Sequence, residues 1–199
     1  MSGLVVGADG KARCGWAGMS ANPEYELYHD REWGRPVSSE RDLFERLSLE
    51  AFQSGLSWLT ILRKRPAFRM AFSNFEPRAV AGFDDDDVLR LMADAGIVRN
   101  LAKIQATIAN ARAVLALPPG ESLTSVVHSH RPEPAELADG SGTLEVPAST
   151  PESVALAKEL KKRGFRFVGP TTAYAMMQAI GLVNDHLPGC WVRGDRAAG

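Results

Sequence analysis

Two cysteines and two histidines lie in pairs toward opposite ends of the chain. His186 and Cys190 are four residues apart, while Cys14 and His29 lie near the N-terminus. Two thiolates and two neutral imidazoles suit a tetrahedral Zn²⁺ ion. The same cysteines could instead form one disulfide or remain free thiols, and buried thiols beside core histidines are common. If all four side chains bind one ion, no position is open for a reactive water, so the metal is structural.

Aromatic residues are concentrated near the N-terminus, and a carboxylate lies among them. Glu50 lies in a weakly charged stretch. A flipped nucleobase needs aromatic faces for stacking and a polar group for its Watson–Crick edge. The alternative is an aromatic core with Glu50 at a helix surface. Because a buried carboxylate is costly without a partner, burial of Glu50 would indicate function. The aromatic candidates are Trp16, Tyr25, Tyr28, Trp33 and Trp58.

A turn containing two glycines is predicted between two helices near the C-terminus. Gly164 and Gly169 mark this turn, and Lys161, Lys162 and Arg163 precede it. Backbone N–H groups at the start of the second helix can bind a phosphate there. The alternative is a plain helical hairpin with a solvated basic face.

Composition restricts the possible classes of function. The chain has 199 residues, with Lys+Arg 23 against Asp+Glu 24 and a net charge of −1. Bulk charge therefore gives no case for nucleic-acid binding, which must come from local patches. No apolar run approaches the ~20 residues that cross a bilayer, and the N-terminus lacks the pattern of a secretion signal. We expect a soluble intracellular protein forming one unit of two helical lobes over residues 1–199.

Helical signals dominate from about residue 39 onward and predict an all-α fold. Period-2 alternation is almost absent. Ser39 and Thr150 are predicted to begin helices as capping residues. A second helix is predicted to begin near Ser57, and Pro66 is predicted to break or restart it. The acidic run Asp84–Asp87 fits a helix N-terminus.

Residues 98–117 carry the longest helical pattern and are expected to lie in the core. The region from Leu117 to Pro151 holds six of the twelve prolines and is predicted to be a loop-rich connection with a short helix near Leu123–Ser129.

Several blocks together resemble the 3-methyladenine DNA glycosylase I family over roughly residues 12–192. The resemblance implies a monofunctional enzyme of the helix-hairpin-helix DNA glycosylase superfamily, which excises 3-methyladenine from alkylated DNA and holds a structural zinc on Cys14, His29, His186 and Cys190. It implies zinc-joined terminal segments at 12–35 and 182–192, with the helix-hairpin-helix at 155–181. The blocks are Arg13-Cys14-Gly15-Trp16, Tyr28-His29-Asp30 with Glu32-Trp33-Gly34, Glu50 through Trp58, and Lys161 through His186.

The resemblance also implies roles for single residues. Glu50 matches the catalytic carboxylate that hydrogen-bonds the methylated base, and Trp58 matches its stacking aromatic residue. Tyr28 matches a pocket tyrosine, with Trp16, Trp33 and, more weakly, Tyr25 as further walls. The residues expected to contact DNA are Lys161, Lys162, Arg163, Gly164, Gly169, Thr171 and Thr172.

Three positions refine this interpretation. Thr171 stands where relatives with lyase activity carry a lysine, so no Schiff base and no strand cleavage are expected. Phe52 departs from the smaller or more polar residues of the family and could change the shape of the pocket. Asp185 is expected to orient the zinc site or to act as an electrostatic helper.

The expected partners are double-stranded DNA containing alkylated bases and free 3-methyladenine as product. We expect a monomer with no membrane association, in the cytoplasm and at the nucleoid. One alternative is a non-catalytic, zinc-stapled module that binds DNA damage. Another is a zinc hydrolase in which one of the four ligands is absent and water completes the metal's coordination.

Overall fold

The computed structural model describes residues 3–37, 39–133 and 146–195. The chain folds into two compact units. Unit 1 comprises Met1–Pro36, Pro132–Ala148 and Met177–Gly199, and unit 2 comprises Val37–Arg131 and Ser149–Met176. The described residues are mostly helical, which confirms the predicted helical class. Among them, no helix is long and apolar enough to cross a membrane.

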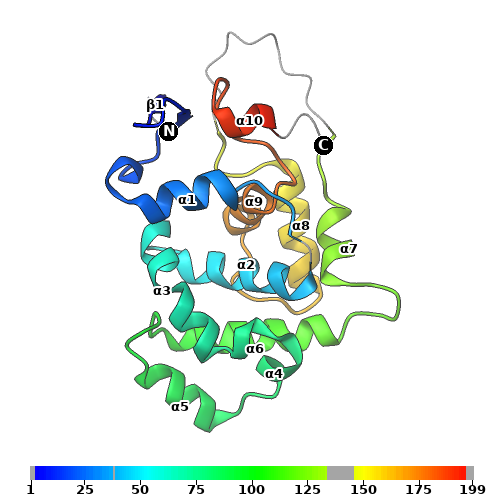
Figure 1. Ribbon diagram of the computed structural model, residues 1–199. Helices are drawn as coiled ribbons and strands as arrows, with labels where there is room; N and C mark the ends of the chain where they lie inside the picture. Colours follow the sequence, from blue (N-terminus) through cyan, green and yellow to red (C-terminus); the bar gives the residue numbers. More distant parts are fainter. Residues whose placement is uncertain (1–2, 38, 134–145, 196–199) are drawn as a thin grey trace. The chain divides into compact units, whose positions relative to one another are not determined.

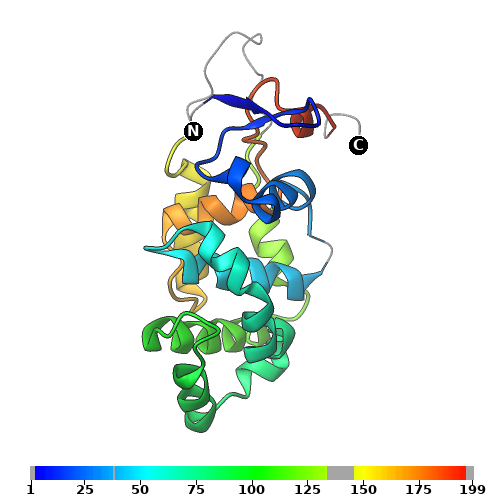
Figure 2. The same ribbon diagram turned by 60° about the vertical axis from the view of Figure 1, so that its left-hand side comes forward.

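Unit 1 contains a small antiparallel sheet that an all-α fold does not include. In it, Leu4 pairs with Cys14 and Val6 with Ala12. The sheet lies beside the last helix of the unit (Figure 2). Three residues per strand are too few to show period-2 alternation, so the sheet left no sequence signal. The elements of unit 1 are β1 (Leu4–Val6), β2 (Ala12–Cys14), η1 (Met19–Ala21), α1 (Pro23–Arg31) and α10 (Trp191–Asp195).

Unit 2 is built of helices. Helix α6 (Leu101–Leu115) packs against α2 (Glu40–Gln53), α4 (Pro77–Ala81) and α5 (Asp85–Ala93). Figures 1 and 2 both show α6, in green, between α2 and α5. The helix α9 (Pro170–Ala179) begins in unit 2 and ends in unit 1. The other elements of unit 2 are α2 (Glu40–Gln53), α3 (Trp58–Ala71), η2 (Ser73–Phe75), α4 (Pro77–Ala81), α5 (Asp85–Ala93), α6 (Leu101–Leu115), α7 (Leu123–His128) and α8 (Pro151–Lys162).

The predicted helix starts are confirmed. The side chains of Ser39, Ser57 and Thr150 each accept a hydrogen bond from the backbone N–H three residues later. Asp84 caps α5 through a reciprocal capping box, so the acidic run serves a helix N-terminus. The short helix near residue 123 is also present, whereas one part of the predicted loop-rich connection, residues 134–145, lies outside the described residues.

The prediction that Pro66 breaks or restarts a helix is wrong. Helix α3 runs through it without interruption, and Pro66 is exposed. Proline removes one hydrogen bond from a helix interior, and the rest of the helix compensates for that loss when one face packs well. Here Ile61, Leu62 and Phe68 supply the buried face.

Phenylalanine side chains form the centre of unit 2. The ring of Phe52 lies 4.6 Å from that of Phe68 and 5.8 Å from that of Phe72, measured between centroids. Phe72 in turn stacks on Phe75 at 5.5 Å. Phe52 is fully buried in this cluster, so its side chain packs in the core of unit 2.

Candidate metal centre and active-site residues

The four predicted metal ligands converge in unit 1. Their donor atoms all lie within 4.8 Å of one another, and all four residues are buried. Cys14 ends β2, His29 lies in the last turn of α1, and His186 and Cys190 flank a turn whose Gly189 has φ +82°. The turn brings His186 and Cys190 together, while the sheet and α1 supply Cys14 and His29.

The distances between donors fit a tetrahedral ion. The Sγ atom of Cys190 lies 3.6 Å from His29 Nε2 and 3.6 Å from His186 Nδ1, and Cys14 Sγ lies 3.7 Å from His186 Nδ1. Metal–sulfur bonds near 2.3 Å and metal–nitrogen bonds near 2.0 Å at tetrahedral angles place sulfur and nitrogen about 3.6 Å apart. The cluster can therefore hold a four-coordinate metal.

Neighbouring groups orient both histidines. His186 Nε2 lies 3.2 Å from the Trp33 carbonyl, and His29 Nδ1 lies 2.9 Å from Asp30 Oδ1. Each contact leaves the other ring nitrogen facing the cysteines, as occurs around metal-binding histidines. Asp30 is held in turn by Arg13, whose Nη2 donates to Asp30 Oδ2 at 2.8 Å.

The electrostatics of the cluster favour one thiolate even without an ion. A hydrogen bond with Cys14, together with those from the two histidines, lowers the pKa of Cys190 despite its burial. The same bond and burial raise the pKa of Cys14. Burial opposes ionisation of Asp30, but hydrogen bonds from Arg13 and His29 keep its pKa below the ordinary value.

Four of the predicted base-binding residues lie in unit 1, grouped around the histidines. Trp16 lies 4.8 Å from Trp33, 5.1 Å from Tyr25 and 6.3 Å from Tyr28, measured between ring centroids. Its ring also meets His29 edge-on at 4.9 Å. Two of these residues therefore also pack the metal cluster, since Trp33 lies 4.5 Å from His186.

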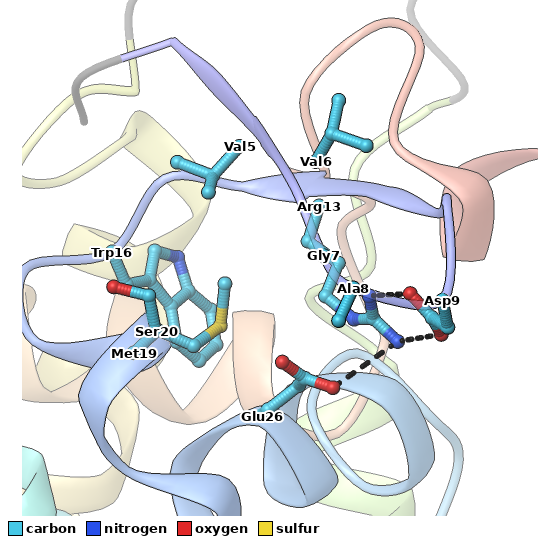
Figure 3. A pocket seen from close by; sticks show the side chains of 10 residues that line it. All are labelled: Val5, Val6, Gly7, Ala8, Asp9, Arg13, Trp16, Met19, Ser20 and Glu26. Atoms are coloured by element: carbon cyan, nitrogen blue, oxygen red, sulfur yellow. Dashed lines mark hydrogen bonds and ion pairs between the residues drawn. The ribbon is translucent and has the colours of Figure 1, made fainter.

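A pocket of about 380 Å³ lies beneath the short sheet of unit 1 (Figure 3). Trp16 and Met19 border one side, and Arg13 borders the other with dashed contacts to Asp9 and Glu26. Both carboxylates are already paired with this arginine, at 2.8 Å and 3.3 Å. The charge of Arg13 is therefore already compensated by its acidic partners. Trp16 is the one predicted base-binding residue among the described residues that line the pocket.

Glu50 and Trp58 belong to unit 2 and lie on consecutive helices. Glu50 is 6% exposed in the last turn of α2, and Trp58 is 8% exposed as the first residue of α3. Burial raises the pKa of Glu50 to about 8, and the charge of Arg46, one turn earlier, only partly offsets this. By contrast, Glu45 on the same helix is paired with Arg69 at 2.8 Å. Glu50 is thus the buried acid of α2 whose ionisation the fold opposes.

The predicted hairpin links α8 to α9. Gly164 has φ +91°, and the N–H of Phe165 donates to the Leu160 carbonyl at 3.0 Å, which ends α8 in a Schellman motif. Lys161 and Lys162 are exposed. Arg163, however, forms ion pairs with Glu159 and Glu121, so most of its charge is already neutralised.

The remaining predicted DNA-binding residues lie at the start of α9. Gly169 precedes α9, and Thr171 and Thr172 lie in its first turn. In unit 1, Asp185 accepts a hydrogen bond from Gln178 at 2.8 Å.

Sequence reasoning missed two buried polar residues of α6. Lys103 contacts the end of α2, and Asn110 contacts the α8–α9 turn. Their signal was present, because a lysine and an asparagine interrupt the apolar stripe formed by Ile104, Ile108 and Ala111.

Known proteins resemble this chain over most of its length. The family model for methyladenine glycosylase matches residues 16–193. The DNA-3-methyladenine glycosylase 1 of Escherichia coli (strain K12) is 49% identical over 179 residues, covering 89% of this chain and 95% of that protein. The DNA-3-methyladenine glycosylase of Haemophilus influenzae is 43% identical over 182 residues, covering 89% and 96%.

Solved structures agree. A crystal structure of 3-methyladenine DNA glycosylase I aligns with a TM-score of 0.81 at 48% identity, covering 90% of this chain and 98% of that one. The Staphylococcus aureus 3-methyladenine DNA glycosylase I, solved to explain 3-methyladenine recognition, aligns with a TM-score of 0.77 at 33% identity, covering 86% and 92%. The chain therefore belongs to the methyladenine glycosylase family.

Proposed function

We propose that this protein is a DNA glycosylase that hydrolyses the N-glycosidic bond of 3-methyladenine in alkylated DNA and leaves an abasic site. Support comes from the family match and from relatives that bear the name DNA-3-methyladenine glycosylase. The observation in the fold that favours chemistry over packing is Glu50, because a carboxylate buried against its own ionisation costs stability.

The reaction suits a carboxylate and an aromatic ring. Methylation at N3 makes the adenine of the nucleoside cationic, so the glycosidic bond is already weakened and the base leaves neutral. Glu50 attracts the cationic base and accepts a hydrogen bond from its exocyclic amine, while Trp58 adds stacking and cation–π attraction. Neutral adenine gains less from both groups, so selectivity is electrostatic as well as steric. Water then attacks the sugar.

The aromatic residues of unit 1 are the other residues that the family resemblance assigns to base binding. Tyr28 is assigned as a base contact, with Trp16, Trp33 and Tyr25 in supporting positions. The packing of Trp16 and Trp33 on the histidines gives these two a second role in holding the metal cluster. Substitution of either is therefore expected to affect metal retention as well as base binding.

The α8–α9 segment is proposed as the helix-hairpin-helix that grips the phosphate backbone of the duplex. Gly164 and Gly169 shape the turn, and the N–H groups of Thr171 and Thr172 at the start of α9 suit a phosphate. Lys161 and Lys162 supply charge, while Arg163 holds the turn through its acidic partners. Because Thr171 stands where a lyase needs lysine, no Schiff base forms and the strand stays intact.

The metal proposed for the cluster is a structural Zn²⁺. A Cys₂His₂ donor set at tetrahedral spacing is typical of zinc. When bound, the ion cross-links the terminal segments. All four donors are present and buried, which argues against a zinc hydrolase, since a hydrolase keeps one position open for water. We further propose that the protein acts as a monomer on double-stranded DNA and releases free 3-methyladenine.

Base release from methylated duplex DNA, resolved by chromatography, tests the function. The parent should release 3-methyladenine, and Glu50→Gln should slow single-turnover release about a hundredfold because a charge-assisted contact is lost. Glu45→Gln is the matched control: it changes another buried carboxylate of α2, but one that Arg69 neutralises. It should lower stability and leave the release rate of the folded protein unchanged.

Failure takes two recognisable forms. A folded, metal-containing parent that binds methylated DNA but releases no base would support the non-catalytic damage-binding module instead. Equal slowing by Glu45→Gln and Glu50→Gln would remove Glu50 from the chemistry.

A further inference from the structure

Helix α6 carries three buried polar side chains on one face. Lys103, Thr107 and Asn110 follow one another at i, i+4 and i+7 and are 7%, 1% and 1% exposed. Residues at this spacing share one side of a helix. Buried polar groups are costly unless they are hydrogen-bonded, so their partners show what each residue holds.

Lys103 holds the end of the helix that carries Glu50. Its Nζ donates to the carbonyl of Phe52 at 3.0 Å and to that of Ser54 at 2.6 Å. The last carbonyls of a helix lack partners within it and favour a positive charge. Ser54 also begins the four-residue connection to Trp58. One ammonium therefore fixes the segment between the two proposed base-binding residues of unit 2.

Asn110 holds the turn of the α8–α9 hairpin. Its side-chain oxygen accepts from the Arg166 N–H at 2.7 Å, and its Nδ2 donates to the Arg166 carbonyl at 3.1 Å. The side chain thus satisfies both backbone groups of a single turn residue. The next residue, Phe167, has φ +55°, so the turn includes a backbone conformation that needs such support.

The two contacts lie at a fixed separation. Seven residues of α-helix span about 10 Å, and a helix packed on three neighbours keeps that distance. A flipped nucleotide remains covalently joined to its phosphates, so a glycosylase must hold base and backbone grips at matching positions.

We propose that α6 is the element that positions the base-recognition segment relative to the phosphate-gripping hairpin, with Lys103 and Asn110 as its two positioning residues. This inference rests on the proposed function for the meaning of the two segments. The contacts themselves do not depend on that function.

Three single variants test the proposal. Lys103→Met removes the ammonium and keeps the length of the side chain. Asn110→Leu removes both hydrogen bonds without adding charge beside the hairpin. Thr107→Val is the matched control, because this buried hydroxyl lies between the other two and donates only to the Lys103 carbonyl within α6 itself, at 3.0 Å.

Two binding measurements should separate the variants. Lys103→Met should weaken binding of free 3-methyladenine, followed by tryptophan fluorescence, about tenfold, and leave affinity for an undamaged duplex at fixed salt unchanged. Asn110→Leu should weaken duplex binding about tenfold and leave binding of the free base unchanged. Thr107→Val should change neither.

Amide hydrogen exchange gives a readout that does not require activity. Lys103→Met should accelerate exchange in residues 54–57, and Asn110→Leu should accelerate it in residues 163–169. Equal loosening of both segments in all three variants, or no change in either, would overturn the proposal. If the parent releases no 3-methyladenine, the proposed function fails, and the exchange pattern still decides whether α6 positions the two segments.

Discussion

At the scale of single residues, Glu50 shows how a reactive group conflicts with stability. The folded state raises the pKa of this carboxyl from 4.5 to about 8. The native protein therefore holds a proton on Glu50 over a range in which the unfolded chain has already lost it. As pH rises from about 4.5 to 8, the free energy of unfolding falls, because the unfolded chain gives up the Glu50 proton in this range while the folded state retains it.

This linkage predicts opposite effects of pH on stability and on activity. Glu50→Gln should be more stable than the parent by about 5 kcal/mol above pH 8 and by much less near pH 5. In the parent, kcat/KM should rise with pH through about 8 as the carboxylate forms, and Glu50→Gln should lack this rise. Urea denaturation and rate profiles across this pH range measure both. A stability difference between the two proteins that does not change with pH would contradict the burial of this charge.

The types of the site residues could be predicted from the sequence, whereas their energetics could not. The Cys and His set was found because few side chains bind a soft metal, and the four donors do converge. The burial of Glu50 was left open, because burial depends on how α2 packs against residues distant in sequence. The sequence pattern predicts Lys103 and Asn110 only as part of an apolar core helix, because their hydrogen-bond partners lie 49 to 56 residues away.

At the scale of elements, the α8–α9 turn depends on the different backbone conformations of its two glycines. Gly164 has φ +91°, while Gly169 has no positive φ, and a Cβ on either glycine would meet nothing within 4 Å. The two glycines therefore differ in the backbone strain that a side chain would cause and do not differ in steric crowding.

Alanine substitutions should therefore have different effects at the two glycines. Gly164→Ala should lower the free energy of unfolding by about 1 kcal/mol because L-residues disfavour this conformation. Gly169→Ala should leave stability unchanged and weaken duplex binding, since a methyl group intrudes where the backbone approaches a phosphate. Urea denaturation and fluorescence anisotropy distinguish these effects. Loss of stability at Gly169 with none at Gly164 would contradict this account of the turn.

Helix boundaries were predictable where a local signal decides them. Ser39, Ser57 and Thr150 cap helices because their hydroxyl groups satisfy N–H groups only three residues away. Pro66 misled because the buried face of α3 outweighs one missing hydrogen bond. The β1–β2 sheet, in which Leu4 pairs with Cys14, could not be predicted because its three-residue strands are too short to show an alternating pattern.

At the scale of the whole molecule, the Cys/His cluster brings the two terminal segments together within unit 1. Leu4 packs close to Gly189 in the turn between His186 and Cys190, so the sheet and this turn support each other. Both cysteines are free, so no disulfide joins residues 14–29 to residues 186–190. The backbone between these segments is their covalent connection.

Removal of the metal should therefore loosen unit 1 in particular. The purified protein should contain about one zinc per chain, and chelation should lower its Tm by about 5–10 °C. Cys190→Ser should have the same effect, whereas His128→Gln, which changes a histidine outside the cluster, should retain the metal. Elemental analysis and calorimetry measure both quantities. Full stability in a metal-free Cys190→Ser protein would show that the cluster needs no ion.

The order of ligands along the chain has a consequence for synthesis. Cys14 emerges from the ribosome 172 residues before His186, and His29 emerges 161 residues before Cys190. A chain that stops before His186 has only one of the two thiolates and one of the two imidazoles of the cluster, and such a pair binds zinc weakly. Capture of the proposed metal therefore requires translation as far as Cys190, so a bound ion would mark the molecules whose synthesis reached that residue.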